Sequence, residues 1–410
     1  MINIKSLLEY ILITEIIFLS GSLYFSNNTL MVMLLSSLGV YLIFNKVYIK
    51  RDNTLILILL LLLITSQYLF TYINGVSIKN IAIIIINLIT LYFIQNNMER
   101  SIFFNKYINL MVIISFVSLI CFILINFFNI GELPLSKSII SGVTEYKITP
   151  YYNMGITQYY WLDGYEAQHE NGFKRNSGIF WEPGAFQAFI NIALLMLANK
   201  YIEKFKGGKV NSFVKKDRYK VIILILALLT TQSTTGYMLG GLIFICTLLG
   251  AKKNINSKYL MRTILFIFFF FIIVILSPIK EVIIDKLINQ TGSYDTRFND
   301  NLASFKIFLD RPLWGYGYSS VTYHLKEIEN NLFDNSSGLG LLFGMMGGIM
   351  ALSYLFLMGK GLSILFKVKG FLLLIIFIIF FIIHSTEWLI FKPLFLMFLF
   401  RFKEDKVKIG

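Results

Sequence analysis

Long apolar runs separated by short polar segments occupy most of this chain. Runs of this kind predict helices that cross a lipid bilayer, because a span needs about 20 mostly apolar residues. Twelve runs fit: 7–25, 30–45, 55–73, 81–95, 108–128, 178–199, 220–231, 235–250, 262–277, 338–358, 371–385 and 388–400. Polar residues interrupt 220–250, and this segment forms either two short spans or one long helix. The pattern predicts an all-α polytopic membrane protein, with a single transmembrane domain over 1–410.

The composition agrees with lipid as the main solvent of the chain. Hydrophobic residues make up 56% and charged residues 15% of the 410 positions, and the mean hydropathy is +0.70. Soluble domains average about 45–50% apolar and about 25% charged residues. Cys121 and Cys246 both lie in predicted spans, and no metal-ligand spacing is present. We therefore expect no disulfide framework, no metal and no other cofactor.

The basic residues predict the orientation in the membrane. With the N-terminus inside, the short inner loops collect the lysines and arginines, including the run from Lys200 to Lys220. The positive-inside rule then predicts that both termini are cytoplasmic. This arrangement explains most of the net charge of +14, so the charge does not indicate a nucleic-acid partner.

Two long segments, 129–177 and 278–337, are predicted to form large extracytoplasmic loops. Loops of this length are usually functional, and a solvated tether is the alternative. The first loop is rich in aromatic residues, among them Tyr159, Tyr160 and Trp161. Such rings suit the apolar faces of sugars, and they equally suit an aromatic belt at the membrane interface.

The second outer loop contains two amphipathic patterns followed by a glycine-rich turn. One pattern, 279–288, is typical of a helix lying on the membrane surface. The other, 297–309, places Arg297, Asn301 and Ser304 on one helix face and the apolar side chains on another. In 311–317, a proline follows Arg311, and Gly315 and Gly317 permit a close backbone approach to a ligand.

Several polar residues lie at predicted membrane depth. Glu182 precedes a proline at the start of the sixth run, where it either lines a cavity or serves as a carboxylate favoured at a helix N-terminus. The Ser/Thr-rich segment 230–236 is either an outer turn or a broken helix beside a cavity. Some of the other ionisable residues within or between spans are expected to pair with each other for structure; the set is Glu9, Glu15, His384, Glu387 and Lys392.

Four of these segments together resemble a known family. Arg175-x-x-Gly-Ile-Phe-x-Glu-Pro-Gly184 resembles the segment that enters a central span of bacterial O-antigen and capsule polymerases of the Wzy type. Ser233-Thr-Thr-Gly-Tyr237 resembles their short Ser/Thr-Gly break. The run from Arg297 to Pro312-Leu-Trp-Gly-Tyr-Gly317 resembles their large outer loop, which O-antigen ligases share. Asp334-Asn335, followed by Gly344 and Gly347, resembles the entry to the next span, although the ligase-type pattern has histidine where Asp334 stands.

The resemblance implies an enzyme of the bacterial plasma (inner) membrane, and the charge pattern predicts that both of its termini are cytoplasmic. An architecture of the GT-C type is compatible with the resemblance. Its reaction would join sugar repeat units carried on undecaprenyl pyrophosphate into O-antigen or capsular polysaccharide on the outer face. Expected partners are these lipid-linked glycans and membrane lipid, with a chain-length regulator and flippase of the same pathway.

This chemistry assigns roles to particular residues. Arginines hold the departing pyrophosphate, since their planar fork matches phosphate oxygens. Arg175 and Arg297 are expected to approach each other for this purpose, with Arg311 behind them. The candidates for the general base, in order, are Asp334, Glu182, His324 and His169. The glycan is expected to contact Tyr159, Tyr160, Trp161, Asn301, Gly315, Gly317 and Asn335.

Two other functions stay open. An O-antigen ligase would move a finished chain to lipid A core, and the aspartate at position 334 argues against it. A polysaccharide flippase or other transporter would be expected to show repeat symmetry with broken helices in both halves. The sequence shows no such repeat.

Overall fold

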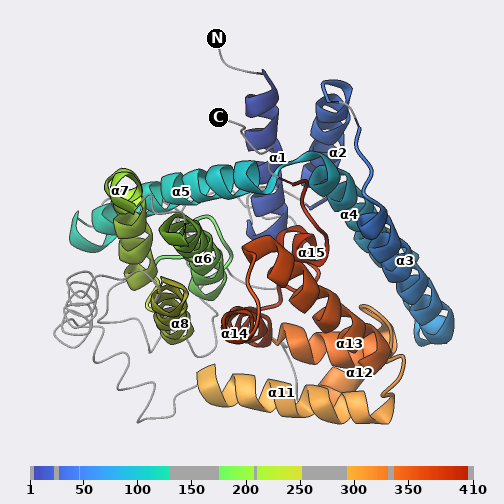
Figure 1. The fold of residues 1–410 in the computed structure, drawn as a ribbon. Coiled ribbons are helices and arrows are strands. Elements are labelled where there is room, and N and C mark those ends of the chain that lie inside the picture. Colours follow the sequence, from blue (N-terminus) through green and yellow to red (C-terminus); the bar gives the residue numbers. More distant parts are fainter. Residues whose placement is uncertain are drawn as a thin grey trace. The chain divides into compact units, whose positions relative to one another are not determined.

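The computed structural model describes residues 4–22, 27–45, 47–128, 175–206, 210–251, 293–330 and 337–404. Within these ranges the chain is helical and contains no β-strand (Figure 1). Residues 129–174, the predicted span 262–277 and the amphipathic pattern 279–288 lie outside the described residues. The all-α prediction is therefore confirmed for the described part of the chain.

The helices follow the apolar runs closely in most places. Their bounds are α1 (Ile4–Gly21), α2 (Asn27–Ile43), α3 (Arg51–Thr71), η1 (Tyr72–Asn74), α4 (Ile78–Asn97), α5 (Arg100–Phe128), α6 (Pro183–Lys206), α7 (Val210–Thr230), α8 (Thr234–Ala251), α11 (Ser293–Asp310), α12 (Val321–Glu329), α13 (Gly338–Phe366), α14 (Phe371–Thr386), α15 (Pro393–Leu396) and η4 (Met397–Leu399). Among the described residues, five helical segments are long and apolar enough to cross a bilayer: Arg51–Asn74, Ile78–Asn97, Arg100–Phe128, Pro183–Lys204 and Gly338–Phe366.

The structure decides two questions that the sequence raised about helix continuity. Residues 220–250 form two helices, because α7 ends at Thr230 and α8 begins at Thr234. The predicted span 388–400 is wrong as a continuous helix, since it contains only α15 and η4. Pro393 is the physical reason: it restricts Lys392 to an extended conformation (φ −75°, ψ 144°) and supplies no N–H to an earlier turn.

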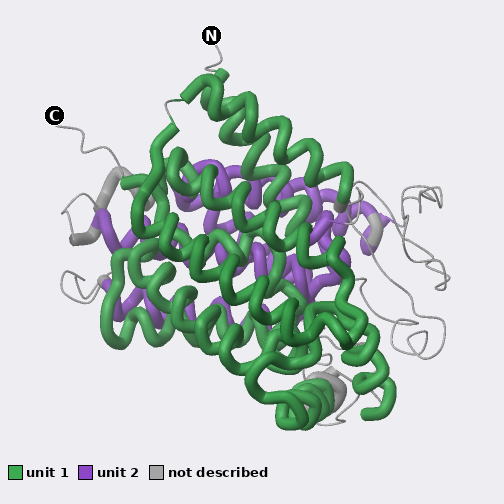
Figure 2. The backbone as a smooth tube through the Cα atoms, turned by 90° about the vertical axis from the view of Figure 1, so that its right-hand side faces the viewer, with its two compact units in different colours: residues 1–20, 28–103, 292–410 green, residues 21–27, 104–291 purple. Residues whose placement is uncertain are grey.

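The chain folds into two compact units (Figure 2). Unit 1 comprises residues 1–20, 28–103 and 292–410, and unit 2 comprises residues 21–27 and 104–291. Unit 1 is therefore built from both ends of the chain, and nearly all of unit 2 is a single insertion within it.

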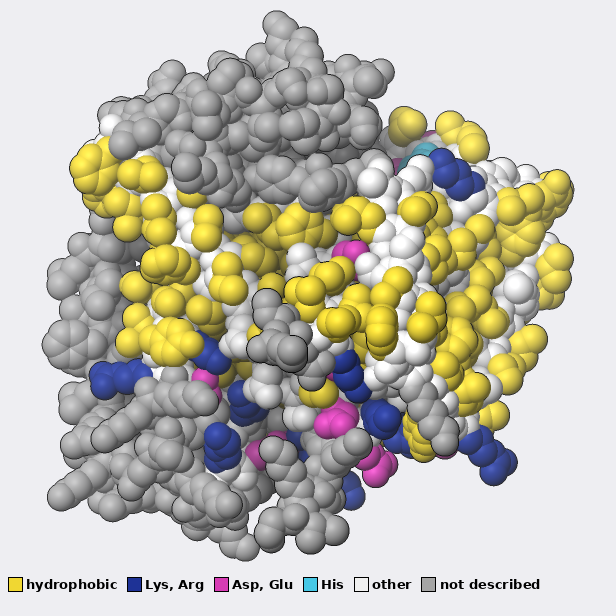
Figure 3. All heavy atoms as spheres, turned by 90° about the horizontal axis from the view of Figure 1, so that it is seen from above, with side chains coloured by type: hydrophobic (Ala, Val, Ile, Leu, Met, Phe, Trp, Pro, Cys, Tyr) yellow, Lys and Arg dark blue, Asp and Glu magenta, His cyan; other side chains and the backbone are white. Residues whose placement is uncertain are grey.

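Apolar side chains cover wide areas of the face of the molecule that Figure 3 shows. On α3 and η1 alone, Leu62 is 62%, Leu69 75% and Ile73 89% exposed. Such a surface would be strongly unfavourable in water and is stable when lipid surrounds it. Together with the long apolar helices, it shows the character of a membrane protein.

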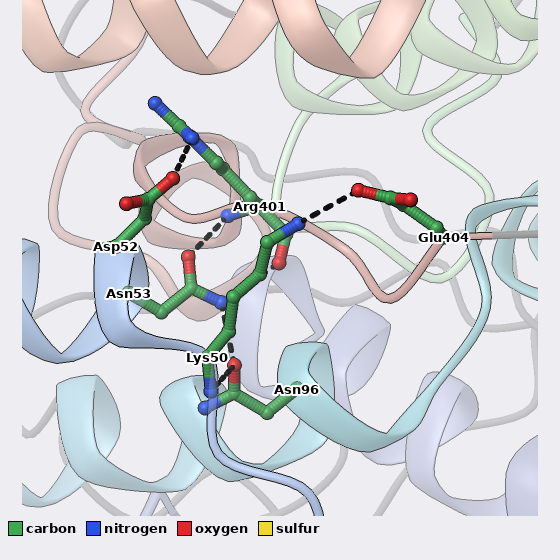
Figure 4. Close-up of polar contacts among 6 residues, drawn as sticks. All are labelled: Lys50, Asp52, Asn53, Asn96, Arg401 and Glu404. Atoms are coloured by element: carbon green, nitrogen blue, oxygen red, sulfur yellow. Dashed lines mark hydrogen bonds and ion pairs between the residues drawn. The ribbon is translucent and has the colours of Figure 1, made fainter.

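Helix α3 runs between two opposite ends of unit 1. At its start, the Asn53 amide pairs with both backbone groups of Arg401: Asn53 Nδ2 donates to the Arg401 carbonyl at 2.8 Å, and Arg401 N donates to Asn53 Oδ1 at 2.8 Å (Figure 4). Asp52 forms an ion pair with the Arg401 guanidinium. We call this the Lys50 end, after the residue whose ammonium lies 3.5 Å from Glu404.

The other end of α3 continues into η1, which contacts α12. We call this the η1 end of unit 1. Because α3 has 21 residues and an α-helix rises about 1.5 Å per residue, roughly 30 Å separates the two ends. That length matches the hydrocarbon thickness of a bilayer. The basic Lys50 end and α12 therefore lie at opposite ends of a span-length helix, and the membrane orientation stays a prediction.

Candidate functional site

In unit 2, the segment that resembles a family entry motif packs on the Ser/Thr break. The Arg175 Nε donates to the Thr231 carbonyl at 3.0 Å, and the Asn176 N–H donates to the Thr230 carbonyl at 2.9 Å. The Asn176 side chain also donates to Ser118 Oγ at 3.2 Å and to Thr230 Oγ1 at 2.9 Å. These contacts satisfy carbonyls at the end of α7, where no next helical turn is available to bond them. They also fix the guanidinium of Arg175 from one side.

Glu182 stands immediately before α6, at the position expected for a helix N-terminal carboxylate. Its carbonyl accepts the Phe186 N–H at 3.1 Å, and Pro183 occupies the first helical position, where a missing N–H costs nothing. Its carboxylate accepts the indole N–H of Trp181 at 3.1 Å. The side chain is partly exposed, so this carboxylate is oriented and still accessible.

Two buried amides on α6 face the same break. Gln187 and Asn191 are both fully buried, and Asn191 Nδ2 donates to Gln187 Oε1 at 3.0 Å and to the Gly236 carbonyl at 3.2 Å. A Cβ on Gly236 would lie 3.0 Å from Gln187 Cβ, so this glycine lets α8 approach α6 closely. The sequence reasoning missed both amides, because they fall inside an apolar run. Their spacing of four residues, which places them on one helix face, was the available signal.

In unit 1, the turn 311–317 pairs with a break in α13. Gly347 has φ 74° and ψ 172°, which interrupts the helix and frees backbone groups on both sides of it. The N–H groups of Tyr316 and Gly317 donate to the carbonyls of Gly344 at 3.1 Å and Met345 at 2.8 Å. In return the Gly348 N–H donates to the Pro312 carbonyl at 2.7 Å. The turn therefore replaces the hydrogen bonds that the kink removes from α13.

Glycine is required on both sides of this pairing. A Cβ on Gly315, whose φ is +64°, would lie 2.5 Å from the Met345 carbonyl oxygen, and a Cβ on Gly347 would clash with the Leu313 carbonyl. The sequence predicted that Gly315 and Gly317 allow a ligand to approach the backbone. The approach that the structure shows is to α13 and, for Gly317, to Thr71 of α3. Direct glycan contacts of these glycines stay a prediction.

Helix α3 and η1 hold the same turn from another side. The Gln67 amide donates to the Met345 carbonyl at 3.1 Å, and Phe70 stacks on Trp314 with ring centroids 4.6 Å apart. Asn74 donates to the Tyr316 carbonyl at 2.9 Å and accepts from the Arg311 Nη1 at 3.0 Å. Sequence reasoning missed Gln67 and Asn74, because more than 200 positions separate them from the turn and nothing local marks the contact.

Helix α11 confirms the helical pattern predicted over 297–309. Its polar face is packed against the protein, and its apolar face is exposed. Ser304 is fully buried and lies where a Cβ on Gly340 of α13 would be 2.6 Å from its Oγ. Asn301 Oδ1 accepts a hydrogen bond from Ser337 Oγ at 2.6 Å. The apolar side chains point outward instead: Phe305 is 55% and Leu309 57% exposed. This reversal of the usual burial is stable when the outward face meets lipid.

His324 lies on α12 next to a buried carboxylate. Its Nδ1 is 2.9 Å from Glu327 Oε2, and the Glu327 side chain is only 12% exposed whereas the imidazole is 57% exposed. A carboxylate on one ring nitrogen sets the tautomer and turns the other nitrogen outward. Glu327 was not singled out from the sequence, although its i+3 spacing from His324 on a helix was visible there.

The remaining sequence candidates are not placed by the structure. Asp334, Asn335, Tyr159, Tyr160, Trp161 and His169 lie outside the described residues. Arg297 belongs to α11, and its side chain is not described. Arg175 and Arg297 lie in different units, so their predicted approach stays a prediction. The structure pairs predicted motifs within each unit. In unit 2, residues 175–176 contact 230–231, and in unit 1, residues 311–317 contact 344–348.

One comparison with known proteins bears on these paired segments. Residues 220–356 match the O-antigen ligase family model. The matched region contains the Ser/Thr break, α11, the turn 311–317, α12 and the kink of α13, whereas Arg175 and Glu182 precede it. No match was found among curated proteins. The family match supports a place in the O-antigen ligase and polymerase family, whose members are enzymes acting on lipid-linked glycans.

Proposed function

We propose that this chain polymerises glycan repeat units carried on undecaprenyl pyrophosphate, on the outer face of the bacterial plasma membrane. The observation that carries the proposal is the match over 220–356, combined with the backbone pairing of the turn 311–317 with the kinked α13 inside that match. The pairing joins two of the matched segments, 311–317 and 344–348, at the η1 end of unit 1, opposite the basic Lys50 end.

The reaction needs a base and fixed cations. A hydroxyl of the acceptor glycan attacks the anomeric carbon of the donor, the bond from that carbon to the pyrophosphate oxygen breaks, and the base takes the hydroxyl proton. Asp334 is the first candidate for the base, followed by Glu182, His324 and His169. Arg175 and Arg297, with Arg311 behind them, would stabilise the negative charge that gathers on the leaving pyrophosphate.

Two observations support this assignment of roles. The Nε of Arg175 is held by the Thr231 carbonyl, so the guanidinium is oriented before any ligand arrives, and such preorganisation lowers the cost of binding. The Glu182 carboxylate is likewise oriented by Trp181 and remains partly exposed. Partner proteins of the same pathway, a chain-length regulator and a flippase, belong to the proposal as well.

A ligase is the second candidate, because the matched family model carries that description. The two activities use the same donor chemistry and differ in the acceptor. The deciding experiment reconstitutes the purified chain with lipid-linked repeat units, in the presence and absence of lipid A core. A ladder of lengthening lipid-linked products without the core acceptor supports the polymerase. Transfer to the core with no ladder in its absence would replace the polymerase by the ligase.

A further inference from the structure

The guanidinium of Arg311 forms no ion pair within the described residues, although a carboxylate, that of the neighbouring Asp310, is close to it in the sequence. Its Nη1 donates instead to the neutral Asn74 amide at 3.0 Å, and its guanidinium carbon lies 4.9 Å from the centroid of the Tyr316 ring. The side chain as a whole is exposed. The guanidinium is therefore supported from two sides by neutral groups, and most of its N–H donors remain available.

The support under Arg311 is rigid because Asn74 is itself fixed. Asn74 is 5% exposed, and its Nδ2 donates to the Tyr316 carbonyl at 2.9 Å. That bond leaves Oδ1 as the atom that faces Arg311. If the amide were reversed, its oxygen would face the Tyr316 carbonyl, which is also an acceptor, and its NH2 would face the Arg311 N–H, which is also a donor. Thr322 Oγ1 donates to the Asn74 carbonyl at 3.2 Å, which ties the same residue to α12.

The nearby acidic and basic groups are occupied with one another. The Tyr316 hydroxyl donates to Asp310 Oδ2 at 3.4 Å, and burial, followed by the nearby Asp310 carboxylate, raises the pKa of Tyr316, so the phenol stays protonated. Lys326 pairs with Glu329 at 2.6 Å, and this contact raises the pKa of Lys326. Neither carboxylate takes the guanidinium of Arg311 directly.

We propose that Asn74 is a positioning residue that presents Arg311 to a phosphate group carried on a lipid, at the η1 end of unit 1. The planar guanidinium fork matches phosphate oxygens in a bidentate way. The residues near Asn74 in the sequence indicate a lipid carrier, because Ile73 is 89% and Phe70 62% exposed. The phosphate has two sources of the same chemistry: the pyrophosphate of a lipid-linked glycan or the headgroup of a bulk phospholipid.

The test is a binding measurement on the purified full-length chain in nanodiscs, with inorganic pyrophosphate and then undecaprenyl pyrophosphate as probes. Arg311→Lys keeps the charge and loses the fork. Asn74→Asp keeps the size of the side chain. Its carboxylate would form an ion pair with Arg311 and neutralise the charge of the guanidinium. We expect both variants to raise the Kd for the probes about tenfold, the loss of roughly one charge-assisted hydrogen bond. Lys306→Gln removes an exposed charge from α11 and serves as the matched control, with Kd unchanged.

The source of the phosphate is identified by the composition of the nanodisc. If phosphatidylglycerol competes with the probes in the parent protein and not in Arg311→Lys, the site takes headgroup phosphate; if it does not compete, the site is specific for pyrophosphate. Thermal unfolding of each variant checks that the fold persists. Unchanged pyrophosphate and phosphatidylglycerol binding in a folded Arg311→Lys protein would overturn the proposal.

The phosphate site at Arg311 rests on the proposed polymerase function only where pyrophosphate is the ligand. The site and the polymerase function can therefore fail separately. Arg311-dependent binding without any polymer from lipid-linked repeat units would count against the proposed function and leave the phosphate site in place. Polymer formation with Arg311-independent binding would do the opposite.

Discussion

At the scale of single residues, the proposed reaction makes its strongest demand where the pyrophosphate would leave. Arg175→Lys and Arg297→Lys each keep the charge and lose the planar fork. We expect each variant to slow polymerisation about tenfold or more, because a hydrogen bond to a charged group is worth roughly 1.5–3 kcal/mol. The measurement is the initial rate of ladder formation from lipid-linked repeat units.

The double variant tests whether both arginines hold the same group. If they do, the losses are not additive, since removing one contact already disturbs the other. Additive losses in the double-mutant cycle, or an unchanged ladder in Arg297→Lys, would contradict the shared role.

The candidate bases give a second prediction at this scale. Asp334→Asn should reduce the polymerisation rate by about 10²-fold or more if its carboxylate takes the acceptor proton, since general-base catalysis contributes about 10²–10⁴-fold. Glu329→Gln is the control, because this acid lies nearby in the chain, is exposed and pairs only weakly with Lys326 at the surface.

Glu182→Gln is the next variant if Asp334→Asn retains its rate, and then His324→Gln. In that last case Glu327 would be the residue that orients the imidazole, so Glu327→Gln should lower the maximal rate and leave the KM nearly unchanged. Glu327→Asp, which preserves the carboxylate, should recover part of the rate. Full rates in all three base variants would leave His169 as the remaining candidate.

Sequence reasoning found the residues that stand in recognisable local patterns. Arg175 and Glu182 were visible as polar residues at the start of an apolar run, and Arg311 as an arginine before a proline. Asn74 and Gln67 were not, because their role comes from contacts with residues more than 200 positions later. An amide near the end of an apolar run has no local feature that separates a structural anchor from a helix-end residue.

At the scale of elements, the kink of α13 is the feature with the clearest energetic consequence. Gly347→Ala should destabilise the fold, because the backbone at φ 74° and ψ 172° is essentially restricted to glycine and a methyl group would meet the Leu313 carbonyl. The strained backbone alone should cost about 1–3 kcal/mol. The measurement is the thermal unfolding midpoint of the detergent-solubilised protein.

Gly241→Ala provides the comparison for this variant. Gly241 lies in α8 with open space at its Cβ position, so alanine there should leave the midpoint unchanged or raise it slightly. Equal midpoints for both variants would mean that the turn 311–317 does not depend on the kink.

The segment after η4 gives another element-scale prediction. Asn53→Ala removes the amide that pairs with both backbone groups of Arg401, and it leaves those groups without this partner at a buried position. We expect a loss of about 1–3 kcal/mol in the free energy of unfolding. Lys50→Ala removes only the ion pair with the exposed Glu404 and should cost about 0–1 kcal/mol. A smaller loss for Asn53→Ala than for Lys50→Ala would contradict the proposed anchoring.

Most helices were predictable because each apolar run is a local signal. The failure at 388–400 has an equally local cause, since hydropathy counts Pro393 as one residue among many, whereas a helix cannot continue through it and the short α15 begins there instead. The kink at Gly347 was not predicted, because its stability depends on the distant turn that pairs with it.

At the scale of the whole molecule, the membrane orientation can be tested directly. We expect a membrane-impermeant thiol reagent to label a cysteine at Lys326, on α12, and to miss one at Lys200, in the basic region predicted to be cytoplasmic. The physical reason is the positive-inside rule together with the separation of the Lys50 end from α12 along α3. The test uses a variant in which Cys121 and Cys246 are replaced by serine. Labelling at Lys200 alone would reverse the orientation.

The division into two units has a consequence for how the protein is made. The N-terminal part of unit 1 is synthesised first, but its packing partners in 292–410 emerge only after all of 104–291 has left the ribosome. At roughly 5–20 residues per second, that interval lasts about 10–40 s. During this time Gln67 and Asn74 have neither the turn nor α13 to bond. Until 292–410 has been synthesised, these two amides must therefore find other hydrogen-bond partners than the ones they have in the folded protein.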